Sequence, residues 1–248
     1  MIRIKVGMAL LTLLLTARAS ISADRVPVLV ELFTSEGCDS CPPADQVLMR
    51  LARERSIGGA DVIVMSEHVD YWNHLGWKDP FSSRLFTDRQ NAYASALGKD
   101  GVYTPQMIVD GRYDVLGGNY AEVARTLSRA SRSSKGSMKV TMQSRGNEVV
   151  LHVEASPSNE AANIYLAVTE DNLFNNVSRG ENKGLRLNHA AVVRRLTLLG
   201  TAKANTSFTM DSSIKAVPEW KTADLHAVVF AQSTKSKVIL SVSEAPFP

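Results

Sequence analysis

The chain has 248 residues, with 28 basic and 25 acidic side chains, and its formal net charge is +3. Arg3, Lys5 and Arg18 account for this excess, because they lie in a first segment, 1–23, that contains no acidic residue. Without that segment the net charge is zero and no basic run or basic helix face remains, so we expect no nucleic-acid partner. The remaining length, about 225 residues, is enough for two modest domains.

Residues 1–23 have the pattern of a signal peptide. Two basic residues stand at the start, a mostly apolar run over 6–15 follows, and small residues near the end provide cleavage sites. The apolar run is too short to span a bilayer well, and no later stretch is long enough. We therefore expect an exported protein, periplasmic or secreted, without stable membrane insertion once the signal peptide is removed.

The two cysteines of the chain, Cys38 and Cys41, are separated by two residues. An apolar stretch over 26–33 predicts a buried strand before them, and 42–52 predicts a helix after them, opening with two prolines that suit a first helical turn. Free amides and the helix dipole at that position stabilise a thiolate, so we expect Cys38 to be the more acidic and more exposed sulfur. A Cys-x-x-Cys pair at a strand-to-helix turn is typical of a redox site.

Predicted strands and helices alternate up to about residue 131. The further elements are a strand over 60–66, a helical insert near 76–100, a hairpin over 103–118 and a helix over 120–131. In the hairpin, Asp110-Gly111 is a strong two-residue turn signal. This order of elements is typical of an α/β domain, with the hairpin at one edge of a mixed sheet.

Beyond a polar linker over 132–137 the hydrophobic period changes to two. About seven short strand candidates separated by polar turns are typical of a β-sandwich. We therefore expect an α/β domain over 24–133 followed by an all-β, sandwich-like domain over 138–248.

The first half resembles the thioredoxin superfamily in three features that occur in the expected order. These are Glu31 in the leading strand, the Cys-x-x-Cys-Pro turn, and Thr104-Pro105 ahead of the hairpin. The resemblance implies a thioredoxin-like fold for the N-terminal domain.

A longer string, Glu-Leu-Phe-Thr-Ser-Glu-Gly-Cys-Asp-Ser-Cys-Pro-Pro-Ala-Asp over 31–45, is more specific. Together with His-Val-Asp-Tyr-Trp over 68–72 and motifs over 180–194, it is similar to a secreted bacterial family known only as a domain of unknown function with a thioredoxin-like fold. The resemblance covers almost all of the chain after the signal peptide. For His189, within the last motifs, we expect a structural, hydrogen-bonded role.

The resemblance to the superfamily also implies roles for single residues. Cys38 would be the attacking thiol and Cys41 the resolving, more buried one. The Thr104–Pro105 bond would be cis and lie across from the disulfide, so that Thr104 offers its backbone to an extended substrate segment. Glu31 would be the buried acid that assists proton transfer to the resolving cysteine.

These features predict a thiol–disulfide oxidoreductase that acts on cysteine-containing exported proteins, is served by a redox donor and needs no dissociable cofactor. The carboxylate of Asp39, between the cysteines, should favour a less oxidising pair. Two alternatives stay open. One is a non-catalytic envelope binding protein with a structural disulfide, and the other is a copper-binding, chaperone-like protein. In the latter, His68 or His74 would join Cys38 and Cys41, because thiolates and imidazoles suit copper(I) or zinc.

Overall fold

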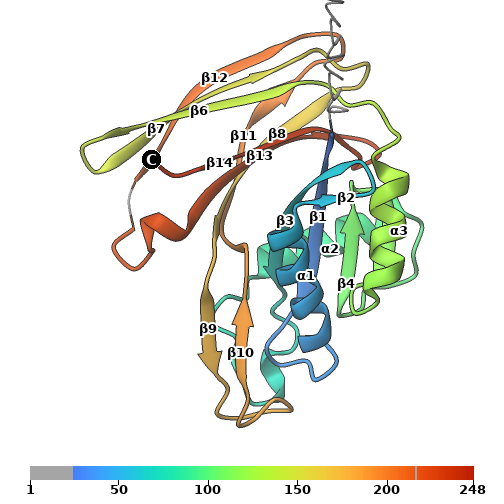
Figure 1. Cartoon of the computed structure of the whole chain (residues 1–248), viewed down its shortest axis with the longest axis vertical. Helices are drawn as coiled ribbons and strands as arrows, with labels where there is room; N and C mark the ends of the chain where they lie inside the picture. Colours follow the sequence, from blue (N-terminus) through green and yellow to red (C-terminus); the bar gives the residue numbers. More distant parts are fainter. Residues whose placement is uncertain (1–24, 216) are drawn as a thin grey trace, which may run out of the picture.

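The computed structural model of the protein describes residues 25–215 and 217–248 (Figure 1). The predicted signal peptide lies outside these ranges. The helices of the described part are α1 (Pro42–Glu54), α2 (Arg84–Ala96) and α3 (Tyr120–Ala130), with short 3-10 turns at Asn73–Leu75 and Thr222–Asp224. None of these helices has the length and apolar character of a membrane span.

The strands of the described part fall into two groups along the chain. Those before the predicted linker are β1 (Val26–Thr34), β2 (Ser56–Ile57), β3 (Ala60–His68), β4 (Gln106–Val109) and β5 (Tyr113–Leu116). Those after it are β6 (Met138–Arg145), β7 (Glu148–Ala155), β8 (Ala162–Glu170), β9 (Leu173–Asn176), β10 (Arg186–His189), β11 (Val192–Ala202), β12 (Phe208–Lys215), β13 (Leu225–Ser233) and β14 (Ile239–Pro246).

One large mixed sheet of nine strands dominates the described part of the chain. Its order is β14-β13-β8-β11-β3-β1-β4-β5, and β2 pairs with the first residues of β3. Strands β1 and β3 are parallel, whereas β4 is antiparallel to β1 and β5 is antiparallel to β4. The Asp110-Gly111 turn joins β4 and β5, as the sequence predicts.

The strands of the second half continue this sheet. A short parallel contact pairs Val192 of β11 with Ser66 of β3, and the amide of Ser66 donates to Ala191 O at 2.8 Å. Strands β8, β11, β13 and β14 come from the part of the chain that the sequence predicts to be a separate sandwich-like domain, yet they extend the main sheet. The molecule thus has a mixed α/β fold with one sheet running through both halves.

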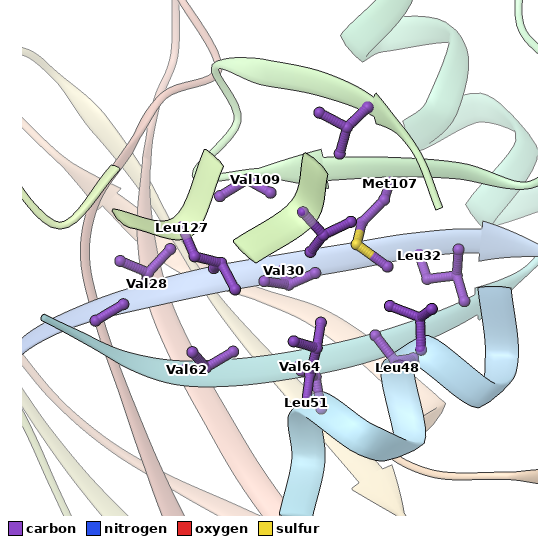
Figure 2. Packing of buried hydrophobic residues seen from close by; sticks show 14 of the residues in the cluster. Val28, Val30, Leu32, Leu48, Leu51, Val62, Val64, Met107, Val109 and Leu127 are labelled. Carbon is purple, nitrogen blue, oxygen red and sulfur yellow. The ribbon is translucent and has the colours of Figure 1, made fainter. Parts of the chain in front are cut away.

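Helices cover both faces of the first part of this sheet. On one face, α1 and α3 pack against the side chains of β1 that point toward them, which include Val28, Val30 and Leu32 (Figure 2). On the other face, α2 packs through Phe86 and Tyr93 on Leu29, Phe33 and their neighbours. Because alternate residues of a strand point to opposite faces, the nearly continuous apolar run of β1 follows from burial on both sides.

A smaller sheet packs on the part of the main sheet that the second half of the chain forms. Strands β12, β7 and β6 form a three-stranded antiparallel sheet, whose Leu151, Val153 and Ile214 pack against apolar residues of β8 and β13. Strands β9 and β10 form a separate hairpin. This hairpin lies beside α1, far from the small sheet (Figure 1), so part of the second half reaches back to the start of the first helix.

Candidate active site

The two cysteines form a disulfide in the turn between β1 and α1, here called the cysteine turn (35–41). Cys41 is the N-cap residue of α1, and Pro42 and Pro43 occupy the first helical positions. The amide of Cys38 donates to Ser35 O at 3.2 Å, and the amide of Cys41 donates to Cys38 O at 3.3 Å. The predicted strand, Cys-x-x-Cys turn and helix are therefore confirmed.

The loop before β4 meets this disulfide. The Thr104–Pro105 bond is cis, as the resemblance implies. The hydroxyl of Thr104 donates to Cys38 Sγ at 3.4 Å and accepts a hydrogen bond from Trp72 Nε1 at 2.8 Å. The structure thus brings Thr104-Pro105 and the cysteine pair together, although they are more than 60 residues apart in the sequence.

Both sulfurs are shielded from solvent in the disulfide form. Cys38 and Cys41 are each 0% exposed, whereas Asp39 and Ser40 between them are exposed. In this form Cys38 is therefore not more exposed than Cys41, contrary to the prediction. Ser40 Oγ lies 3.3 Å from Cys38 Sγ and supplies another polar contact.

The segment between β9 and β10, here called the cover loop (177–185), is hydrogen-bonded to the cysteine turn. Asn182 Nδ2 donates to Cys38 O at 2.8 Å and to Glu36 O at 2.9 Å. The amide of Asp39 donates to Glu181 Oε2 at 3.2 Å. Residues more than 140 positions downstream therefore hold the backbone on both sides of the first cysteine.

Glu36 is a buried carboxylate in the cysteine turn, and it is 0% exposed. Its oxygens accept hydrogen bonds from Trp77 Nε1 and Asn175 Nδ2, each at 2.8 Å, and lie 2.9 Å from His189 Nε2. Several donors are needed to offset the desolvation of a buried charge. The structural role expected for His189 fits its place as one of these partners.

A second acid–imidazole pair lies beside the first. His68 Nδ1 is 2.7 Å from Asp79 Oδ2, which also accepts the amide of Glu36 at 2.9 Å. Burial opposes ionisation of Asp79, but the nearby imidazole of His68 and these hydrogen bonds keep the pKa of the carboxyl below its ordinary value. The rings of His68 and His189 are 4.8 Å apart, edge to face.

The two histidines of the copper alternative lie in different surroundings. His68 is fully buried and engaged by Asp79, whereas His74 is exposed and its Nδ1 lies 2.6 Å from Tyr71 O. Within the described ranges, no group of three or more His, Cys, Asp or Glu side chains is arranged to hold a metal ion. Copper binding stays a prediction from the sequence.

Glu31 is buried, but its hydrogen-bonding partners lie on the α2 side of the sheet. Arg89 Nε donates to Glu31 Oε1 at 2.7 Å, and the Tyr93 hydroxyl donates to Oε2. Arg89 also lies 3.4 Å from Glu67, whose pKa is raised by burial even though Arg89 counteracts the shift. None of the hydrogen bonds described for Glu31 reaches a cysteine, so its assigned role in proton transfer stays a prediction.

Sequence reasoning missed Glu36, Asp45 and Asn182. Asp45 is buried on the inner face of α1 together with Ala44 and Leu48. An acid in a first helical turn is ordinarily read as a favourable dipole contact. The sequence signal that could have singled out Asp45 was its position on the apolar side of the helix. Asn182 lies within the motifs over 180–194, but no role could be assigned to it, because its partners are set by the tertiary fold.

Similarity to solved structures was found over most of the chain. The crystal structure of a protein from Agrobacterium tumefaciens is 30% identical, covers 90% of this chain with 96% of its own length, and has a TM-score of 0.70. No curated protein matches the chain.

Two other solved structures have much lower scores. The curli protein CsgC of E. coli is 11% identical, covers 45% of this chain with 99% of its own, and has a TM-score of 0.24. A beta-glucosidase from Kluyveromyces marxianus is 13% identical, covers 52% of this chain with 16% of its own, and has a TM-score of 0.22. Both TM-scores are too low to support a conclusion about this chain.

A family described as "Protein of unknown function (DUF1223)" matches residues 29–232. This range holds the cysteine turn, the cis bond and the cover loop, and it spans most of the chain. The protein is therefore a member of this family.

Proposed function

We propose that the protein is an exported thiol–disulfide oxidoreductase, in which Cys38 and Cys41 exchange electrons with cysteine-containing proteins. One observation carries the proposal: a disulfide at the start of α1 is contacted at Cys38 Sγ by Thr104, the residue before a cis-proline. A disulfide that closes so short a loop adds little to stability through chain entropy. Reactivity therefore gives a better reason for its presence than stability does.

The arrangement of the first half supports a thioredoxin-like core. Strands β3-β1-β4-β5 form that part of the sheet, α1 and α3 lie on one face, and α2 lies on the other. The reactive turn precedes α1 and the cis bond precedes β4. This is the order and placement that the resemblance to the superfamily implies.

The exchange proceeds through a mixed disulfide. The Cys38 thiolate attacks one sulfur of a substrate disulfide, and the other substrate sulfur leaves as a thiolate that takes up a proton. Cys41 then loses its proton and attacks Cys38 Sγ, which releases the second substrate thiol and restores the Cys38–Cys41 bond. Two electrons pass to the substrate, and the reverse sequence oxidises a dithiol.

The surroundings of the turn support a role in an oxidising compartment. A disulfide persists in exported proteins and is rare in the cytosol, so we place the protein in the periplasm or outside the cell. The exposed carboxylate of Asp39 should oppose the helix dipole at Cys38 and make the pair less oxidising. A separate redox donor would then keep the pair reduced, and the protein would act mainly as a reductant or isomerase.

Trapping mixed disulfides in cells tests the proposal. Cys41→Ala removes the resolving thiol, so adducts that depend on Cys38 should accumulate on a non-reducing gel. Cys38→Ala should form none, and the wild type should accelerate reduction of insulin by a thiol. No adduct with Cys41→Ala, together with no insulin reduction, would favour the non-catalytic binding protein instead.

A further inference from the structure

The resolving cysteine of the proposed reaction needs a partner that accepts its proton. The thiol of Cys41 must become a thiolate before it attacks Cys38 Sγ. Cys41 is 0% exposed in the disulfide form, so bulk water does not reach it directly. A buried thiol also resists ionisation. A nearby base within the protein would remove this obstacle.

Asp45 has the position for this task. It lies one helical turn after Cys41, and its amide donates to Cys41 O at 3.2 Å. Side chains four residues apart on a helix are neighbours. Asp45 is 6% exposed on the inner face of α1, and its Oδ1 has no hydrogen-bond partner among the described residues. A buried carboxyl oxygen without a partner is costly, and a catalytic duty would explain why it is kept.

A small cavity gives Asp45 a route to solvent. The cavity has a volume of about 60 Å³ and is lined by Asp45 and Gln46 of α1 and by Arg186 and Asn188 of β10, among others. This volume has room for one or two water molecules. Polar side chains on both walls can serve as partners for such water.

The charges around Asp45 suit repeated gain and loss of a proton. Burial raises the pKa of Asp45 to about 7. The imidazole of His189 on β10 and the nearby hydroxyl of Thr34 lower it, and the carboxylates of Asp79 and Glu36 raise it. Arg186 lines the same cavity, with its guanidinium over the ring of Phe174. Near neutral pH the carboxyl is therefore present in both protonation states, the condition under which a general base works well.

We propose that Asp45 is the proton acceptor for Cys41 and returns the proton to solvent through this cavity. The assignment rests on the proposed thiol–disulfide exchange. In the resolving step the Cys41 S–H bond breaks and its proton passes to the Asp45 carboxylate. The Cys41–Cys38 bond then forms, the bond from Cys38 to the substrate sulfur breaks, and the substrate leaves as a thiolate. The reverse transfer supplies the proton when the disulfide is opened.

The reaction of the reduced protein with dithiobis(nitrobenzoic acid) separates the two steps. Attack by Cys38 releases a first coloured thiolate, and resolution by Cys41 releases the second. In the wild type the rate of the second phase should rise with an apparent pKa near 7. In Asp45→Asn it should be at least about tenfold slower at pH 7, and its rise should move toward the pKa of an unassisted thiol, roughly 8.5 or higher. The first phase should keep its pH dependence.

Controls keep the outcomes distinct. Asp88→Asn makes the same chemical change on an exposed part of α2 and should leave both phases as they are. Asp45→Glu keeps a carboxyl in a displaced position and should retain part of the rate of the second phase. If circular dichroism shows that Asp45→Asn does not fold, Asp45→Glu takes its place in the test. An unchanged second phase in Asp45→Asn, or a change confined to Glu31→Gln, overturns this assignment. If the wild type shows no second phase, the proposed function itself fails.

Discussion

Single charged residues inside the fold make its stability depend on pH, and Asp45 gives the clearest case. Its pKa is about 7 in the folded chain against an ordinary value of 3.8. Between these values the unfolded chain has released the proton while the folded chain still holds it. Because stability falls with rising pH wherever the folded state binds more protons, Asp45 destabilises the fold progressively from about pH 4 to 7, and this cost is complete above pH 7.

Asp45→Asn should remove this cost. We expect the free energy of unfolding of the variant, relative to the wild type, to increase between pH 4 and pH 8 by up to about 4 kcal/mol, the limit set by the pKa shift. Urea denaturation of the oxidised proteins at both pH values measures the difference. With Asp88→Asn, an exposed carboxylate paired within one helix, the difference should change little. A flat difference for Asp45→Asn would contradict the raised pKa.

The local setting of the cysteine pair could be assigned from the sequence, whereas most contacts set by the tertiary structure could not. The place of Cys38 and Cys41 before a helix follows from local pattern and from the prolines. The contact of Thr104 with Cys38 required the resemblance to a known fold. The role of Asn182 could not be assigned, because a loop asparagine has many ordinary uses and only the folded chain shows what it binds.

Among the structural elements, the hairpin of β9 and β10 has the most direct effect on the cysteine turn. Its Asn175 and His189 hold Glu36, and Asn182 in the cover loop holds Cys38 O. Because Cys38 is fully buried in the disulfide form, an attacking thiol reaches it only after part of its surroundings has moved. Opening of such a loop is a local event with its own free energy, smaller than that of global unfolding.

Asn182→Ala should make the disulfide easier to reach. The change removes two hydrogen bonds to the backbone of Glu36 and Cys38. Each net contribution is about 1 kcal/mol, so the open form should become roughly ten- to thirtyfold more populated. Reduction by dithiothreitol at pH 7 should accelerate by a similar factor. Asn147→Ala, on the exposed turn between β6 and β7, is the matched control. An unchanged reduction rate for Asn182→Ala would mean that access is governed elsewhere, for example at Trp72.

The elements themselves were largely foreseeable, because each has a local cause. The hairpin turn at Asp110-Gly111, the helix after Cys41 and the period of two beyond residue 137 all have direct physical reasons. Their assembly was not foreseeable. The junction of β3 with β11 depends on a short pairing around Ser66 and Val192, and nothing in either strand alone selects the other as its neighbour.

At the scale of the whole molecule, apolar packing and the buried Arg89 join the two halves of the chain across their shared sheet. Leu29 and Met65 of the first half lie in one cluster with Val228 and Phe230 of the second. Arg89 of α2 donates to Glu31 and also to Gln232 Oε1 at 3.1 Å. Polar and apolar contacts therefore both cross the line between the two predicted domains.

This joint predicts that the two halves unfold together. Exposing Leu29, Ile63, Met65 and Phe86 by detaching the second half would cost on the order of 6–12 kcal/mol, at roughly 1.5–3 kcal/mol for each side chain. That cost is comparable to the whole stability of a typical protein, so the first half should not persist alone. Hydrogen exchange in the native state measures this directly, since the slowest amides of each strand report the free energy of the opening that exposes them. The slowest amides of β1 and of β13 should give the same free energy and the same dependence on added urea. If the amides of β13 exchange through an opening of distinctly lower free energy while those of β1 stay protected, the halves are separate folding units despite their common sheet.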